Sequence, residues 1–141
     1  MSIPARFRYG LLTAAMLTAI FWSSSRPDVG GSQSTALVLL ASNLFHAPLF
    51  AGLAFCWIRA LARGQQATPA VYSAAFVASA ASALLDESHQ SFVPGRDASA
   101  GDLLLDFAGI SAMLLILHIR NRRGTVIEPC RPEASCEGHA R

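Results

Sequence analysis

Four apolar stretches separated by short polar segments dominate the pattern of this chain. They cover residues 9–25, 43–62, 67–86 and 102–120, and most charged residues lie between or beyond them. A helix needs about 20 predominantly apolar residues to cross a bilayer, with about 17 as the lower limit. The pattern therefore predicts an all-α fold: a polytopic membrane protein that forms a bundle of four transmembrane helices.

A cleavable signal peptide is the alternative interpretation of the first stretch. Arg6 and Arg8 would form its basic region and residues 23–25 its cleavage site. No A-x-A pattern is present there, however, and three further apolar stretches follow. We therefore expect this segment to be retained as a helix.

The arginines predict how the bundle is oriented. Seven of them flank the apolar stretches on one side: Arg6, Arg8, Arg59, Arg63, Arg120, Arg122 and Arg123. The first and third loops carry one each, Arg26 and Arg96. Because cytoplasmic segments are enriched in basic residues, we expect both termini in the cytoplasm and a multi-pass protein of the bacterial inner membrane.

Composition supports a membrane protein and argues against a soluble domain, a nucleic-acid-binding protein and a metal- or disulfide-based fold. The chain is 52% hydrophobic and 14% charged, whereas soluble domains carry about 25% charged residues. The net charge of +2 gives no basis for nucleic-acid binding, and the three cysteines show neither metal-ligand spacing nor a disulfide framework. No metal or other cofactor is expected. Residues 1–123 are predicted to form one membrane domain and the polar residues 124–141 a disordered cytoplasmic tail.

One charged segment, residues 86–109, interrupts the apolar chain. It holds five of the nine acidic residues and lies on the outer face in the predicted topology, together with the outer half of the second helix. Since buried charge is costly, we interpret this region as functional rather than solubilising. The candidate functional cluster consists of His46, Glu87, Gln90, Arg96, Asp102 and Asp106.

Asp106 is the most unusual member of this cluster. Asp102 and Asp106 are four residues apart, so they share a helix face, and Asp106 lies one turn inside the apolar stretch. An ionisable group at that depth must find a partner or stay protonated. His46 and Arg96 are the candidate partners.

Structural explanations of the same residues stay open. Ser99-x-x-Asp102 matches a capping box, in which Asp102 would satisfy amides at the helix start. Arg96 would then pair with Glu87 or Asp102 and hold the loop in place. Gln90 is expected in the loop, where it would face solvent or cap the preceding helix.

Small residues recur every four positions in the third stretch. They form two rows, Ala74, Ala78 and Ser82 in one and Ala75, Ser79 and Ala83 in the other. This spacing lets helix backbones approach closely within lipid. The third helix is therefore expected at the centre of the bundle.

Several polar residue types recur at fixed spacing between His46 and Gly109. The downstream pattern is Glu87-x-x-Gln90-x-Phe92-x-Pro94-x-Arg96-x-x-Ser99-x-x-Asp102, followed by Asp106 and Gly109, and the upstream pattern is His46, Phe50 and Gly52-Leu53. Over about residues 9–119 the chain resembles the VanZ-like family of small bacterial membrane proteins. The resemblance implies a protein of the cell envelope, since the founding member is associated with low-level resistance to the glycopeptide teicoplanin.

Two departures from that family's pattern are visible. Ser42 and Asn43 stand where an Asp-Lys pair is frequent, so the expected ligand or partner preference differs. Asp106 stands where asparagine is frequent, which adds a titratable group. Some relatives carry a phosphotransbutyrylase label, but no phosphate-cradling glycine loop supports it here.

The sequence leads to three functional hypotheses. In the preferred one, which is non-enzymatic, the outer-face cluster recognises an envelope lipid, a wall precursor or a glycopeptide, or contacts a membrane partner or a second copy of the chain. The second is an intramembrane enzyme acting on a lipid phosphate or headgroup, in which Arg96 holds the phosphate while His46 and Glu87 act as base and acid. The third is proton-coupled transport through His46 and Asp106, which would require an oligomer.

Overall fold

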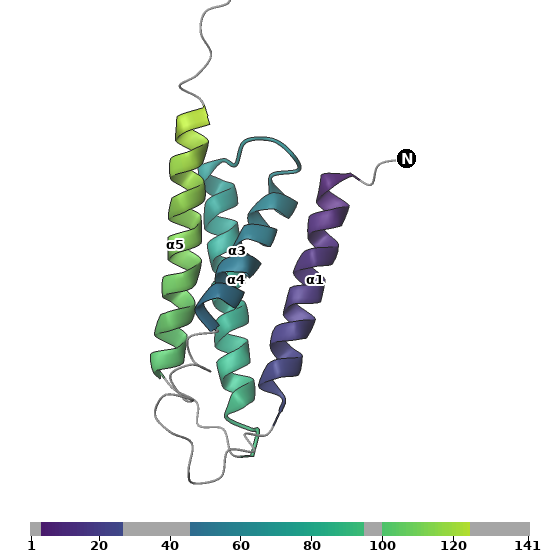
Figure 1. The fold of residues 1–141 in the computed structure, drawn as a ribbon, viewed down its shortest axis with the longest axis vertical. Coiled ribbons are helices and arrows are strands. Elements are labelled where there is room, and N and C mark those ends of the chain that lie inside the picture. Colours follow the sequence, from purple (N-terminus) through teal and green to yellow (C-terminus); the bar gives the residue numbers. More distant parts are fainter. Residues whose placement is uncertain (1–3, 27–45, 95–99, 125–141) are drawn as a thin grey trace, which may run out of the picture.

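The computed structural model describes residues 4–26, 46–94 and 100–124, and four helices make up this part of the chain (Figure 1). They are α1 (Ala5–Ser24), α3 (His46–Leu61), α4 (Pro69–Gln90) and α5 (Ala100–Gly124). The described residues contain no strand. The all-α prediction is thereby confirmed for them, and the predicted tail, apart from Gly124, lies outside the described residues.

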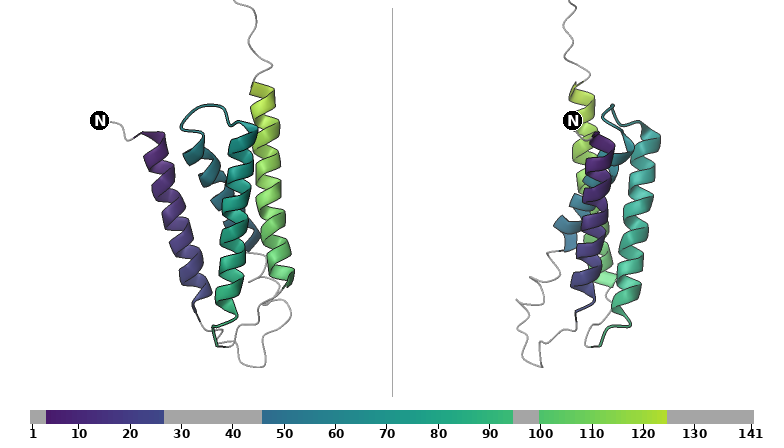
Figure 2. Two further views of the ribbon diagram at one scale, coloured as in Figure 1. Left: turned by 180° about the vertical axis from the view of Figure 1, so that it is seen from behind. Right: turned by 90° about the vertical axis from the view of Figure 1, so that its right-hand side faces the viewer.

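Consecutive helices run in opposite directions along the bundle (Figures 1 and 2). The start of α1, the connection between α3 and α4, and the end of α5 lie together at one end. This end, termed the arginine end, carries the seven arginines that flank the apolar stretches and no described acidic residue. The opposite, acidic end holds the four described carboxylates, those of Asp86, Glu87, Asp102 and Asp106.

Two of the described helices, α4 and α5, are long and apolar enough to cross a membrane. Only 22% and 17% of their apolar windows are buried, whereas a core helix of a soluble protein would be mostly covered. Helix α3 is apolar but has 16 residues, which at about 1.5 Å per residue is shorter than a hydrocarbon core of about 30 Å. Two of the four predicted spans thus meet the length and hydropathy requirement.

Helix α3 lies at the centre of the bundle and packs against all three other helices, most extensively against α5. It supplies Phe50, Leu53 and Ala54, each fully buried, to a hydrophobic core that also contains Ala83 of α4 and Ile110 of α5. The prediction that the third stretch forms the central helix is therefore wrong. Helix α4 uses its small residues at the edge of this core, while the bulkier side chains of α3 fill the middle.

Helix α4 begins at a conventional cap and continues further than its apolar stretch indicates. The Thr68 hydroxyl accepts a hydrogen bond from the Val71 amide at 3.4 Å, and Pro69 occupies the first helical turn, where its missing N–H leaves no bond unmade. The helix ends at Gln90, so residues 86–90 form its last turn rather than part of a loop. The expectation that Gln90 lies in the loop is corrected accordingly.

Helices α3 and α5 approach each other closely near the acidic end. A Cβ atom added at Gly109 would overlap the carbonyl group of Ala47 and lie 3.0 Å from its Cα atom. Only a residue without a side chain allows the two backbones to meet at this point. The contact sets the separation of the helices that carry His46 and Asp106.

We expect Gly109→Ala to lower the free energy of unfolding by about 1–3 kcal/mol, because the added methyl group must displace backbone atoms. Gly10→Ala is the matched control, since a Cβ atom at Gly10 meets no atom within 4 Å. Alanine is the better helix former by about 0.5–1 kcal/mol, so the control should be neutral or stabilising. Thermal unfolding of the purified proteins in detergent measures both, and equal shifts would contradict the close contact.

Candidate functional site: a buried polar cluster at the acidic end

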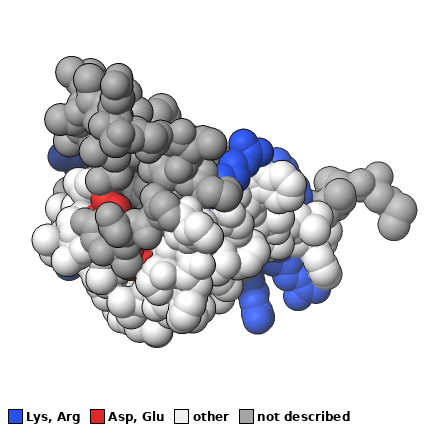
Figure 3. Space-filling view, turned by 90° about the horizontal axis from the view of Figure 1, so that it is seen from below, with Lys and Arg blue, Asp and Glu red and all other residues white. Residues whose placement is uncertain are grey.

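Polar side chains from all four described helices meet near the acidic end. The cluster, termed the polar cluster, consists of Ser24 at the end of α1, His46 at the start of α3, Asp86 and Gln90 in α4, and Asp102 and Asp106 in α5. All of them except His46, which is half-buried, have relative exposures of 7% or less. Viewed from this end, parts of the acidic side chains reach the surface (Figure 3).

The stripe of small residues on α4 leads directly into the polar cluster. Ala75, Ser79 and Ala83 are fully buried, and the same face continues through Asp86 and Gln90, which are 6% and 2% exposed. Residues three and four apart lie on one helix face. The packing that buries the small residues therefore also removes Asp86 and Gln90 from solvent.

A hydrogen-bonded triad joins α1 to α4 within the cluster. The Ser24 hydroxyl and the Gln90 amide both donate to Oδ2 of Asp86, each at 2.8 Å, and the same amide lies 3.3 Å from the Ser24 oxygen. Hydrogen bonds to a charged acceptor each contribute about 1.5–3 kcal/mol. Nearby, the Ser25 hydroxyl lies 3.0 Å from Nε2 of His89, so a second polar contact supports the same pair of helices.

The histidine of the cluster faces a carboxylate on α5. Nδ1 of His46 lies 3.6 Å from Oδ1 of Asp106, within ion-pair range but beyond hydrogen-bond distance. Neither atom has a hydrogen-bond partner among the described residues. Asp106 is 1% exposed, so its carboxylate is nearly desolvated. The sequence predicts Arg96 or His46 as the partner of Asp106, and the structure places His46 beside it.

A third carboxylate lies one turn before Asp106 on the same face of α5. Asp102 is 7% exposed, and its buried Oδ1 also lacks a hydrogen-bond partner within the described part of the chain. The charges of Asp86, Asp102 and Asp106 all act on the His46 imidazole. The cluster thus places three carboxylates around one basic group, and its oxygen acceptors outnumber its N–H and O–H donors.

The other two predicted site residues, Glu87 and Arg96, are not part of the polar cluster as the structure describes it. Glu87 is half-buried in the last turn of α4, next to Asp86 in sequence but on a neighbouring face. Arg96 and the predicted capping residue Ser99 lie outside the described residues. The ion pairs expected for Arg96, and its role in holding a phosphate, therefore stay predictions.

The acceptors do not form a metal site of recognisable geometry. Among residues 4–26, 46–94 and 100–124, no group of three His, Cys, Asp or Glu side chains is arranged to hold a metal ion. Buried oxygens are normally hydrogen-bonded, so Oδ1 of Asp102 and Oδ1 of Asp106 require donors from outside the described side chains. Water or a ligand with N–H or O–H groups would supply such donors.

Comparison with known proteins identifies the family of this chain. The family model for VanZ/LLP1 matches residues 3–121, which is most of the chain. The chain belongs to the VanZ/LLP1 family. The resemblance inferred from the spacing of the polar residues is confirmed by this match. No curated protein and no solved structure matches the chain.

Two members of the polar cluster in this VanZ/LLP1 protein escaped the sequence analysis. Asp86 was assigned to the end of a span and Ser24 to the end of the first helix, and neither was a candidate. The four-residue spacing of Asp86 and Gln90 is the signal that could have found the first, because it places both on one face of a continuing helix. Nothing in the sequence pairs Ser24 with a residue 62 positions away.

We expect Gln90→Ala to destabilise the protein by about 1–3 kcal/mol, because it removes a donor from a buried carboxylate. Ser88→Ala is the control, since the exposed Ser88 hydroxyl donates only to the Leu84 carbonyl of its own helix; its effect should stay within about 0.5 kcal/mol. Thermal unfolding in detergent measures both. Combining Gln90→Ala with Ser24→Ala should give a non-additive loss because both donors serve one oxygen, and additive losses would show that they act independently.

Proposed function

We propose that this VanZ-like protein is a non-enzymatic, four-span protein of the bacterial inner membrane whose polar cluster recognises an envelope component. The ligand is the headgroup of an envelope lipid or wall precursor, or a glycopeptide such as teicoplanin. The buried Oδ1 atoms of Asp102 and Asp106, which have no hydrogen-bond partner among the described residues, carry this proposal. A stable core would pair such groups internally, whereas a binding site leaves acceptors for its ligand.

The orientation follows from the distribution of charge between the two ends. All seven arginines that flank the apolar stretches are at the arginine end, which the positive-inside rule assigns to the cytoplasm. Helices α1 and α3 would complete the four spans beside α4 and α5, with the short α3 starting part-way along the bundle (Figure 1). The polar cluster then faces the outer side, where wall precursors and glycopeptides occur.

This topology predicts opposite accessibilities for two exposed positions. In a chain whose three cysteines are replaced, Ser91→Cys should react with a membrane-impermeant maleimide in intact cells, because Ser91 follows α4 at the acidic end. Gln66→Cys, in the connection between α3 and α4, should react only after the membrane is permeabilised. Reaction of both positions from the same side would exclude a span formed by α4, and the reverse pattern would invert the orientation.

The chemistry of the cluster indicates which ligand groups it accepts. Oδ1 of Asp102 and Oδ1 of Asp106 are acceptors, so a complementary group donates hydrogen bonds or carries positive charge. Ammonium, amide and hydroxyl groups meet this requirement, and ethanolamine headgroups, peptides of wall precursors and glycopeptides all present them. A low-dielectric surrounding strengthens such contacts once the ligand has replaced water.

We expect Asp102→Asn and Asp106→Asn to weaken binding by about tenfold or more, because each removes a charged acceptor. Asp102→Asn should not lose stability, since the buried Oδ1 of Asp102 makes no hydrogen bond to described residues. Asp106→Asn also breaks the ion pair with His46 and should lower the free energy of unfolding. Binding of teicoplanin, and of phosphatidylethanolamine against phosphatidylcholine, is measured on purified protein; phosphatidylcholine lacks N–H donors. Teicoplanin sensitivity of cells expressing each variant provides the cellular readout.

Ser82→Ala is the matched control for this series, because its hydroxyl donates to the Ala78 carbonyl within α4 and lies outside the cluster. It should bind as the unmodified protein does. Equal binding by all variants would overturn the proposed site. A loss of stability in both aspartate variants, without a change in binding, would show that the carboxylates serve the fold alone.

A further inference from the structure

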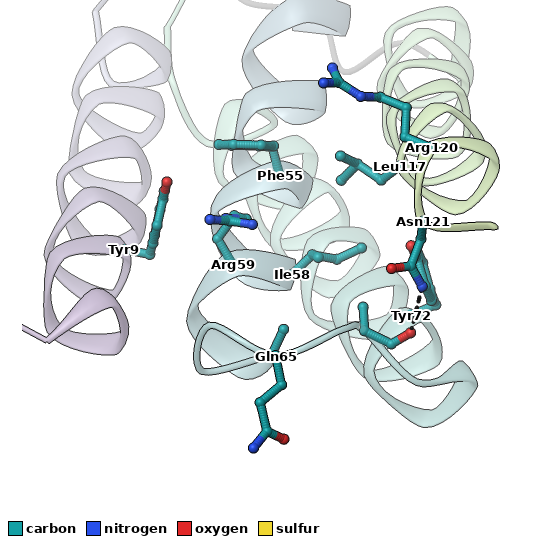
Figure 4. Close-up of a pocket in the computed structure, with 11 residues that line it drawn as sticks. Tyr9, Phe55, Ile58, Arg59, Gln65, Tyr72, Leu117, Arg120 and Asn121 are labelled. Atoms are coloured by element: carbon teal, nitrogen blue, oxygen red, sulfur yellow. Dashed lines mark hydrogen bonds between the residues drawn. The ribbon is translucent and has the colours of Figure 1, made fainter. Parts of the chain in front are cut away.

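A second polar feature lies at the arginine end, far from the polar cluster. A cavity of about 440 Å³ opens there over α3, between α1 and α5 (Figure 4). Helices α1 and α5 do not contact each other within the described residues, and α3, α4 and the connection between them also line the cavity. The volume lies within the range of about 300–1,000 Å³ typical of sites for small ligands.

Two arginines dominate the chemistry of this cavity. Arg120 extends from α5 toward α3, and Arg59 of α3 points toward Tyr9 (Figure 4). The Arg59 guanidinium carbon lies 5.1 Å from the centre of the Tyr9 ring, which orients the side chain by a cation–π contact without neutralising it. Both cationic groups therefore line the same opening.

No carboxylate of the described residues lies near these charges. No described acidic residue lines the cavity, and the four described acidic residues all lie at the opposite end of the bundle. Among the described residues, the ion pair of His46 with Asp106 is the one salt bridge present, so Arg59 and Arg120 have no acidic partner there. Two like charges facing one cavity repel each other, and an anion bound between them would relieve that repulsion.

The other lining residues divide the cavity into a polar and an apolar part. The amide of Asn121 donates to the Ala67 carbonyl at 3.2 Å, which fixes the connection between α3 and α4 at the rim. Phe55, Ile58 and Leu117 line the remaining wall. Cations at a rim above an apolar wall match the boundary between a lipid headgroup and its acyl chains.

We propose that this cavity binds an anionic phosphate group, with Arg59 and Arg120 as its two ligands. Arginine suits this role because its planar fork donates two parallel hydrogen bonds to phosphate oxygens. Basic pockets between helices near a membrane surface recognise phospholipid headgroups in the same way. The phosphate belongs either to an anionic phospholipid or to a soluble molecule, and the apolar wall fits the lipid.

The test compares two double variants of the full-length protein that carry the same change in charge. Arg59→Gln with Arg120→Gln removes both proposed ligands. Arg8→Gln with Arg123→Gln removes two exposed arginines from the same end but outside the cavity. Lipid binding is measured by native mass spectrometry and in nanodiscs of phosphatidylcholine with or without phosphatidylglycerol, and inorganic phosphate is titrated separately.

We expect phosphatidylglycerol binding to weaken at least about tenfold in the cavity variant, since the loss of one charge-assisted contact alone changes a dissociation constant by about that factor. The control variant should change less than about threefold, as expected for exposed charges near a surface. If inorganic phosphate shows the same dependence on the two arginines and phosphatidylglycerol does not, the ligand is soluble and the phosphate site stands. Equal losses in both variants, or no loss in either, would overturn the proposal.

A substitution that keeps the positive charge tests whether a loss of lipid binding results from unfolding. Arg59→Lys with Arg120→Lys retains both positive charges but removes the bidentate forks. Its affinity should lie between those of the unmodified protein and the glutamine variant, with thermal unfolding unchanged because both arginine side chains are exposed. Full binding by the lysine variant would show that the positive charges suffice without bidentate hydrogen bonds. Full binding by a folded glutamine variant would exclude the proposed phosphate site.

Discussion

The close contact between the backbones of α3 and α5 sets the geometry on which the acidic end depends. Gly109 lies directly against Ala47, and any larger residue would force the two helices apart. His46 precedes Ala47, and Asp106 lies three residues before Gly109, so the contact brings their side chains to 3.6 Å from each other. A carboxylate that is 1% exposed thereby obtains its basic neighbour.

Acidic and basic side chains lie at opposite ends of the bundle, and they differ in their exposure to solvent. The acidic end buries Asp86, Asp102 and Asp106 and supplies Asp86 with two donors. The Oδ1 atoms of Asp102 and Asp106 have no hydrogen-bond partner among the described residues. The arginine end keeps its cations at the surface, where long side chains reach solvent or headgroups at little cost. One end consequently offers acceptors in a desolvated cluster, and the other offers donors around an open cavity.

Helix formation was predictable from the chain, because apolar stretches of about 20 residues allow few other structures in a membrane. The local error lay at the end of α4, where a drop in hydropathy at Asp86 suggested a loop. No proline or glycine stands between Asp86 and Pro94, so the backbone continues as a helix to Gln90. Hydropathy reports the preferred environment of a side chain, whereas helix termination depends on the backbone and on capping.

The sequence alone determined that this chain forms helices, that its charges separate between two ends, and that His46, Gln90, Asp102 and Asp106 accompany each other in a VanZ-like pattern. Tertiary structure decided which of them are partners. Ser24 reaches Asp86 across 62 residues of sequence, and Arg59 and Arg120 line one cavity that no local pattern encodes. Desolvation and pairing depend on neighbours in space, and those neighbours are established only when the helices pack.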